Sequence, residues 1–267
     1  MNILRKSIAP ITDRAWEELV EQTNRFTSEY LTGRKIVDID GPNGIEYGAI
    51  STGRLTIPEK QEKESVNYGI REVLPLLEIR KPFTLDLWEL DNASRNAEDI
   101  DLENLENAAR DVAAFEDRVF YYGFKGVNAP GLIKSNEGKA EKIELKIEQF
   151  TKCLAEQVVK LRQRAVEGPY SLVIPAQVWA ELSSQSTLYP VMQQIRDIIG
   201  GKIIVHHENK DIFLLSERGG DFELSIGQDI SIGYDGHDND KVKLYFTESF
   251  MYRIIGPEAF TVLKPVA

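Results

Sequence analysis

The sequence predicts an α+β fold in which helices pack on antiparallel sheet, and three patterns lead to this class. Residues 222–234 and 242–254 alternate apolar and polar side chains, as strands with one buried face and one solvent face do. Residues 102–120 repeat apolar side chains every three or four positions, which indicates an amphipathic helix. Residues 45–74 contain too few large apolar side chains to form a core of their own. The chain therefore predicts a mixed body with a long appendage.

The composition limits the kinds of partner that the protein can bind and the cell compartment in which we expect it. The chain has 267 residues, of which 42% are hydrophobic, and this suffices for one large core or two modest ones. Its formal net charge of −11 argues against binding to nucleic acid or to anionic membranes, since both require a basic face. The lone Cys153 cannot form an intramolecular disulfide, and no stretch approaches a membrane span or a signal peptide. A soluble cytoplasmic protein is expected.

The amino-terminal part predicts one helix and one short strand. The helix is expected over residues 13–30, because Thr12 can cap it and its apolar side chains fall on one face. Gly33 ends this helix. A strand over residues 35–39 then leads into a turn at 41–44, which is rich in glycine and proline.

The appendage at residues 45–74 differs in kind from the rest of the chain. It alternates only weakly, is interrupted by Gly48, Gly53 and Pro58, and carries a charged run at 59–64. Such a segment is either disordered or ordered by packing on something else. The sequence favours a long flexible hairpin that leaves the body.

The remaining part of the chain alternates strands and helices before ending in a long hairpin. No internal repeat and no linker divides it, so any second domain is expected to be inserted and not joined in tandem. A turn at 235–240 joins the two carboxyl-terminal strands. The other expected elements are strands over 75–83, 170–174, 202–205 and 212–215, helices over 102–120 and 142–166, and a short helix opened by Pro175.

The search for catalytic motifs finds none. The chain has no Walker loop and no serine nucleophile elbow, and its glycines lack the spacing of a dinucleotide turn. His206 and His207 are adjacent on an expected strand and point to opposite faces, so they do not form a metal site. The acidic turn at 235–240 lacks the glycine and glutamate of a calcium loop. No isolated pair of carboxylates in an apolar setting is evident. We therefore expect no catalytic residues, no metal and no enzymatic activity.

Two further residues have competing interpretations. Trp88 lies in a segment that alternates, where a planar ligand such as a flavin could stack on it; the alternative is a buried or interface tryptophan. Otherwise no cofactor is expected. Cys153 lies beside Phe150 and Leu154 on the apolar side of a helix, which favours packing over nucleophilic chemistry.

Six blocks of sequence, taken together in their order and spacing, resemble one family: GRKIVDIDGPNG (33–44), TLDLWELDN (84–92), AFED (114–117), EGPYSLVI (167–174), SERGGDF (216–222) and GQDISIGY (227–234). This family is the encapsulins, also called linocin or bacteriocin-like shell proteins, and the resemblance covers essentially the whole chain. It implies the tailed-phage major capsid fold (Hong Kong 97-like), with a peripheral domain, an extended loop and an axial domain.

The resemblance assigns the domains. It implies a peripheral domain made of residues 1–40, 81–130 and 228–267, an extended loop arm at 41–80, and an axial domain at 131–227. The helix over 102–120 would be its spine helix. An arm without a core gains stability only by pairing between subunits, so an obligate oligomer is expected. Closed symmetry then implies an icosahedral homo-oligomer of about sixty copies.

The resemblance also implies the function and its sites. The shell would enclose a cargo enzyme, a peroxidase or a ferritin-like iron oxidase, recruited through a carboxyl-terminal targeting peptide. The residues that match the peptide site are Arg34 and Asp38 for polar contacts, Ile39, Ile230 and Ile232 for apolar contacts, and Asp229 nearby. A plain structural ion pair between Arg34 and Asp38 is the alternative.

A pore and two rival functions complete the expectations. The uncharged loop at 183–189 resembles the segment that lines the five-fold pore, and it predicts weak ion selectivity. Its residues are Ser183, Ser184, Gln185, Ser186, Thr187, Leu188 and Tyr189. A prophage major capsid protein is the first rival, and it would require DNA-packaging partners. A hydrolase or bacteriocin-like antibacterial protein is the second rival.

Overall fold

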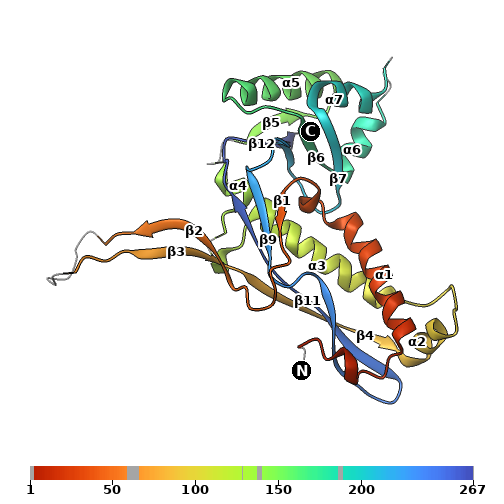
Figure 1. Ribbon diagram of the computed structural model, residues 1–267. Coiled ribbons are helices and arrows are strands. Elements are labelled where there is room, and N and C mark those ends of the chain that lie inside the picture. The colour runs from red at the N-terminus through yellow and green to blue at the C-terminus, as the bar shows by residue number, and fades with distance from the viewer. Residues whose placement is uncertain (1–2, 59–65, 128, 137–139, 186–188, 267) are drawn as a thin grey trace.

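Two five-stranded sheets form the body of the protein, and a two-stranded hairpin projects from it (Figure 1). The structure is a computed structural model and describes residues 3–58, 66–127, 129–136, 140–185 and 189–266. The helices are α1 (Asp13–Tyr30), α2 (Leu87–Ser94), α3 (Glu103–Tyr122), α4 (Gly131–Ser135), α5 (Ile147–Gln163), α6 (Ala176–Ser183) and α7 (Val191–Ile199), with short 3-10 helices η1 (Lys6–Ile8), η2 (Gly33–Lys35) and η3 (Lys125–Val127).

The first sheet is built around one long strand. Strand β11 pairs antiparallel with β4 on one edge and with both β10 and β9 on the other, and β1 runs parallel to β9. In Figure 1 this sheet lies in the lower half of the body, beside α1 and α3. Its strands are β1 (Asp38–Asp40), β4 (Leu77–Asp86), β9 (Phe222–Ile226), β10 (Ser231–His237) and β11 (Lys241–Ile254).

The carboxyl-terminal hairpin is confirmed, but its first strand is split in two. Residues 227–230 leave the ladder between β9 and β10, where Gly227 donates to the Ser249 carbonyl and Ser249 donates to the Gln228 carbonyl. A Cβ atom at Gly227 would lie 2.5 Å from the Ser249 hydroxyl, so only glycine fits this close approach. We refer to residues 227–230 as the junction loop.

Strand β11 is largely buried on both faces, although its alternation predicted that one face is exposed to solvent. Phe246 and Phe250 are buried on one face, and Tyr245 and Met251 are buried on the other. Met251 packs in a cluster with Ile50 at the base of the hairpin, while the Tyr245 hydroxyl donates to a backbone carbonyl of the amino-terminal segment. Segments distant in sequence therefore cover the face that the alternation assigned to water.

Helices α1 and α3 confirm the helices predicted over residues 13–30 and 102–120, and both pack beside the first sheet. Ten side chains of α3 are buried, including the expected Leu105, Ala109 and Val112. Helix α2 corrects the expectation of alternation around Trp88, because the Asp86 side chain accepts from the Trp88 amide and starts a helix there. The short strand expected at 35–39 is displaced as well, since η2 precedes the strand β1.

The Thr12 cap offers a test of the α1 prediction. The Thr12 hydroxyl oxygen accepts from the Ala15 amide at 3.2 Å, as expected for an N-cap. Replacing Thr12 with alanine should lower the free energy of unfolding by about 1 kcal/mol, because one helix amide loses its acceptor. Chemical denaturation measures this change, and Thr12→Ser, which retains the hydroxyl, is the matched control. Equal losses in both variants would contradict a capping role.

The second sheet lies at the other end of the body, with α5, α6 and α7 packed around it (Figure 1). Its order is β5-β12-β8-β6-β7, and every residue of β6 is buried. The helix expected from residue 142 begins later, because residues 141–144 form β5. The strands are β5 (Glu141–Glu144), β6 (Tyr170–Pro175), β7 (Gly200–His206), β8 (Ile212–Ser216) and β12 (Phe260–Val266).

Two strands pair across the expected domain boundaries. Strand β12 hydrogen-bonds to β5 and β8 in the second sheet, although residues 228–267 were assigned with the first. Strand β9 belongs to the first sheet, although it falls within residues 131–227. Pairing depends on register between distant segments, which a linear sequence does not specify. The division into domains otherwise stays a prediction.

The expected hairpin appendage is formed by β2 (Ala49–Thr56) and β3 (Ile70–Pro75), which pair with each other alone among the described strands. Ile50 is buried at its base. Farther out, apolar side chains are more than half exposed, and a two-stranded ribbon is at best marginally stable by itself. We call this hairpin the arm. The exposed side chains are Leu55, Ile57, Ile70 and Val73.

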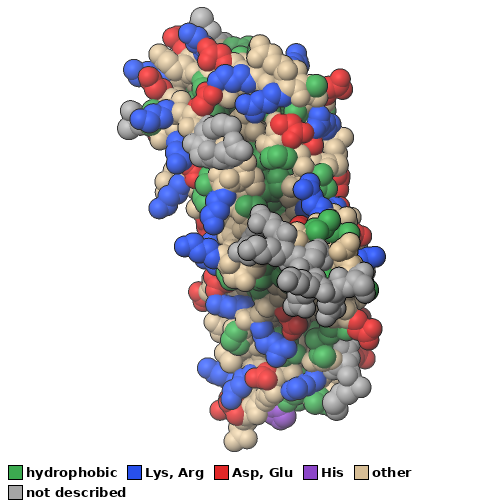
Figure 2. Space-filling model, turned by 90° about the vertical axis from the view of Figure 1, so that its left-hand side faces the viewer, with side chains coloured by type: hydrophobic (Ala, Val, Ile, Leu, Met, Phe, Trp, Pro, Cys, Tyr) green, Lys and Arg blue, Asp and Glu red, His purple; other side chains and the backbone are tan. Residues whose placement is uncertain are grey.

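Viewed end-on along the arm, hydrophobic side chains are exposed beside it among charged ones (Figure 2). Within the described part of the chain, no helix has the length and apolar character needed to cross a membrane.

Candidate functional site

A buried ionic cluster centres on Arg34. The 3-10 helix η2 positions this residue next to α3 and to strand β11 of the first sheet. The turn is fixed because the Thr32 and Gly33 amides both donate to the Asp117 carboxylate of α3, each at 2.9 Å. A Cβ atom at Gly33 would lie 2.9 Å from the Tyr252 hydroxyl, so glycine allows η2 to approach the core closely. Arg34 is thereby directed between α3 and β11.

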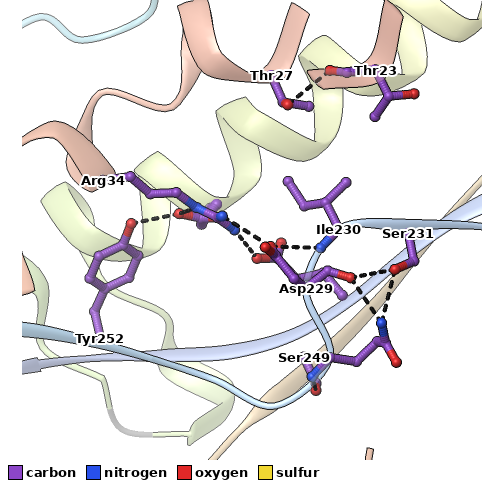
Figure 3. Close-up of polar contacts among 11 residues, drawn as sticks. Thr23, Thr27, Arg34, Asp229, Ile230, Ser231, Ser249 and Tyr252 are labelled. Carbon is purple, nitrogen blue, oxygen red and sulfur yellow. Dashed lines mark hydrogen bonds and ion pairs between the residues drawn. The ribbon is translucent and has the colours of Figure 1, made fainter. Parts of the chain in front are cut away.

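Arg34 binds three carboxylates (Figure 3). Its Nε and Nη2 donate to Glu116, at 3.1 and 2.8 Å, and Nη2 also donates to Glu248 at 2.6 Å. Its Nη1 donates to Asp229 of the junction loop at 3.0 Å. The Tyr252 hydroxyl donates to Glu116 Oε1 at 2.6 Å. We call Arg34, Glu116, Asp229, Glu248 and Tyr252 the Arg34 cluster.

The side chains of Glu116 and Glu248 are fully buried, and the electrostatics follow from this. Burial, followed by the charge of Glu116, raises the pKa of Glu248 well above its ordinary value. Burial and then Glu116 also raise the pKa of Tyr252, so its phenol stays protonated. Burial alone would lower the pKa of Arg34, but hydrogen bonding and charge from Glu116, with Glu248 and Asp229, raise it overall. Arg34 is a permanent cation.

Arg34 and Asp38, whose ion pair was the alternative to peptide contacts, have different partners in the structure. Asp38 lies in β1, and its Oδ2 accepts from the Gly220 amide at 2.6 Å. Only 16% of the Arg34 side chain is exposed, and its hydrogen bonds go to the cluster. The partners of Arg34 are instead carboxylates of α3, β11 and the junction loop.

The three isoleucines assigned to a peptide site lie in different settings. Ile39 is 50% exposed on β1, and Ile230 is partly buried and extends from the junction loop toward α1 (Figure 3). Ile232 is 2% exposed and belongs to the core beside Leu19, so the expectation that it contacts a peptide is wrong. Ile232 occupies an inward position of β10, in the cluster that also holds side chains of α1 and α3. Asp229 keeps 45% of its side chain exposed at the rim of the Arg34 cluster.

Glu116, Glu248 and Tyr252 were missed by sequence reasoning, and the expectation of no carboxylate pair in an apolar setting is wrong. The signal was present: Glu116 occupies the apolar stripe of α3, and Glu248 interrupts the inward series of β11 between Phe246 and Phe250. A charged residue at an inward position indicates a buried partner.

The described part of the expected pore loop is tied to α5. Ser183 ends α6 and is exposed, as is Ser184. The Gln185 amide donates to the Leu145 carbonyl and its oxygen accepts from the Ile147 amide at 2.9 Å. Ser186, Thr187 and Leu188 lie outside the described residues.

Tyr189 closes the same loop, and its hydroxyl donates to Asp197 of α7 at 3.4 Å. A carboxylate therefore lies beside the expected uncharged run. A pore role stays a prediction.

The remaining candidate residues lie outside the Arg34 cluster. Trp88 is 69% exposed in the first turn of α2, so it is not buried within this chain, and flavin stacking stays a prediction. Cys153 packs against the core as expected, and burial raises the pKa of its thiol. His206 Nδ1 accepts from two backbone amides and its Nε2 lies 3.1 Å from Asp117. Over the residues with described positions, no three His, Cys, Asp or Glu side chains are grouped to hold a metal.

The fold is that of phage capsids and virus-like particles. A virus-like particle from Pyrococcus furiosus matches with a TM-score of 0.64 at 17% identity, covering 93% of this chain and 99% of that one. The capsid of Myoviridae phage XM1 matches with a TM-score of 0.55 at 11% identity, covering 88% and 92%. The protein thus belongs to the class that has the phage capsid fold.

The sequence comparison identifies the family. Residues 1–251 match the family described as "Encapsulating protein for peroxidase". The type 1 encapsulin shell protein of Rhodospirillum rubrum is 36% identical, over 99% of this chain and 97% of that protein. The counterpart from Rhodococcus erythropolis is 33% identical, over 98% and 100%. The chain belongs to the encapsulin shell protein family.

Proposed function

We propose that this chain is a non-enzymatic shell subunit that assembles with copies of itself into a closed icosahedral nanocompartment of about sixty subunits. The proposal rests on the arm, whose outer apolar side chains are exposed in the single chain. Its exposed Leu55, Ile57 and Ile70 would be buried by a neighbouring copy, which supplies the free energy that a lone two-stranded ribbon lacks. Electron microscopy of the purified protein tests this directly, and a stable monomer would contradict it.

A cargo enzyme inside the shell is the second part of the proposal. The family description names a peroxidase, and we propose a peroxidase or a ferritin-like iron oxidase, carried in by a carboxyl-terminal targeting peptide. A cytoplasmic location agrees with the single cysteine. The prophage capsid alternative shares the fold, but it requires particles filled with nucleic acid. Ultraviolet absorbance ratios of purified particles separate the two functions.

The cargo peptide is proposed to bind the exposed surface that includes Ile39, Ile230 and Asp229. Ile39 offers apolar area, and Asp229 offers a carboxylate that is partly free of Arg34. Replacing Ile39 with aspartate should reduce cargo occupancy about tenfold, because one lost apolar contact of about 1.4 kcal/mol has this effect. The measurement is the amount of a reporter, fused to the candidate peptide, that co-purifies with particles.

A matched control separates peptide binding from general damage. Val159 of α5 is exposed to 52%, close to the 50% of Ile39, and lies in the part of the body built on the second sheet. Val159→Asp should load cargo normally in any particles that it forms. Normal loading of Ile39→Asp particles would remove Ile39 from the site.

A further inference from the structure

The carboxyl groups of the Arg34 cluster outnumber its single positive charge. Arg34 supplies one positive charge, while Glu116, Glu248 and Asp229 supply three carboxyl groups. Asp229 is partly solvated, but the side chains of Glu116 and Glu248 are both fully buried. A second uncompensated charge in such a place is unfavourable, because water cannot solvate it. Two buried carboxylates that share one guanidinium therefore favour the uptake of a proton.

The hydrogen bonds identify where this proton resides. Glu248 Oε2 is buried, and none of the described residues donates a hydrogen bond to it. Arg34 Nη2 donates both to Glu116 Oε2, at 2.8 Å, and to Glu248 Oε1, at 2.6 Å, so the two carboxyl groups converge on one nitrogen. Two ionised carboxylates held by one nitrogen repel each other, whereas a proton on one of them removes this repulsion. Glu116 already accepts from Arg34 and from Tyr252, so Glu248 is the better proton carrier.

We propose that Glu116 and Glu248 share one bound proton at neutral pH and that loss of this proton in alkaline solution loosens the base of the arm. The groups that face the pair are Arg34 of η2, Asp117 of α3, Asp229 of the junction loop and Tyr252 of β11. Helix α1 contributes uncharged hydroxyls in this region, and both donate to carbonyls of their own helix (Figure 3). These are Thr23 and Thr27.

The junction loop connects the pair to the arm. Arg34 holds the loop through Asp229, and Ser249, the neighbour of Glu248, exchanges backbone hydrogen bonds with Gly227 and Gln228. The other side of the loop holds the segment that leads into the arm, since the Gly44 amide donates to the Gly227 carbonyl at 2.9 Å. A charge that repels within the cluster therefore acts on the segment that sets the position of the arm.

The direction of the pH effect follows from the raised pKa of Glu248. A carboxyl group whose pKa is higher in the folded than in the unfolded protein stabilises the fold fully below its ordinary pKa of about 4.3. This stabilisation is lost as the pH rises through the folded pKa. The base of the arm is therefore held in place at acidic and neutral pH and is loosened at alkaline pH.

The variant Glu248→Gln tests the proposal, because glutamine retains a donor where the protonated acid has one but cannot ionise. Melting temperatures of the full-length wild type and variant should agree near pH 5 and diverge toward about pH 10, with the wild type lower. The exposed Glu17→Gln change removes the same charge and should leave the wild-type profile unchanged. Parallel profiles of wild type and Glu248→Gln would overturn the proposal.

Two local measurements on the wild type keep the proposal testable even if Glu248→Gln fails to fold. Infrared spectra of the wild type should contain the carbonyl band of a protonated carboxylic acid at neutral pH, and its absence would overturn the proposal. Hydrogen exchange at the Gly44 and Gln228 amides, corrected for the intrinsic pH effect, should accelerate about tenfold or more as that band disappears. The Ser216 amide, which donates to Ala259 in the second sheet, should not change in step.

The effect on the shell rests on the proposed assembly, and the readouts keep the two separable. The infrared band and the exchange rates report on the subunit whether or not it assembles. Light scattering of particles reports on assembly, and wild-type particles should open at a lower pH than Glu248→Gln particles. Particles that never form would contradict the proposed function while leaving the shared proton in place. Particles without the infrared band would contradict the shared proton alone.

Discussion

Replacing Arg34 with methionine is expected to lower the free energy of unfolding by about 3–5 kcal/mol, because it leaves Glu116 and Glu248 buried without a counter-charge. Methionine fills much of the same volume, so the loss reports on charge more than on packing. Chemical denaturation at a fixed protein concentration measures the change.

The exposed pair of Arg14 and Glu17 provides the matched control. Both side chains are more than half exposed, and their closest charged atoms are 3.5 Å apart. Arg14→Met should change the free energy of unfolding by no more than about 1 kcal/mol, because solvent screens surface ion pairs. If Arg34→Met loses no more than this control, the Arg34 cluster has no structural role.

The largest effect on assembly is expected from the arm. A double change of Leu55 and Ile57 to aspartate should abolish particle formation while the body of the subunit remains folded. Each side chain fully buried between subunits is worth about 1.5–3 kcal/mol, and closed symmetry repeats this loss at every subunit. Size-exclusion chromatography and electron microscopy measure the assembled fraction. Circular dichroism measures the retention of secondary structure.

Conservative changes at the same two positions test the physical cause. Leu55→Val with Ile57→Val keeps both side chains apolar and should still give particles. Both residues are more than half exposed in the single chain, so neither substitution removes an internal contact of the body. Normal particles from the aspartate variant would show that the arm does not hold the shell together.

Periodicity predicted the elements whose partners are local. Helix α1 begins and ends where its apolar stripe and Thr12 cap indicated, and β6 is buried throughout as expected. The carboxyl-terminal hairpin was found for the same reason, since its two strands are joined by a short turn. The arm was recognised by what it lacks, namely large apolar side chains that would form a core.

Long-range pairing accounts for the errors. The resemblance placed Ile232 among the contacts of a peptide, but in the folded protein it is buried in a cluster with side chains of α1 and α3. The assignment of residues 228–267 to one domain missed β12, which crosses to the second sheet and pairs with β5 and β8. Neither contact is visible in local sequence, because each joins segments that are far apart along the chain.

The sequence by itself determined the class of fold, the absence of a core in the arm and the resemblance to encapsulin shell proteins, because composition, periodicity and motif order are properties of the chain. Only the tertiary structure decided the partners of Arg34, which bring together α3, β11 and the junction loop. The sequence shows Glu116 and Glu248 as two charged residues in apolar series, 132 positions apart. Their burial against one guanidinium exists only in the folded protein, and that burial makes a shared proton favourable.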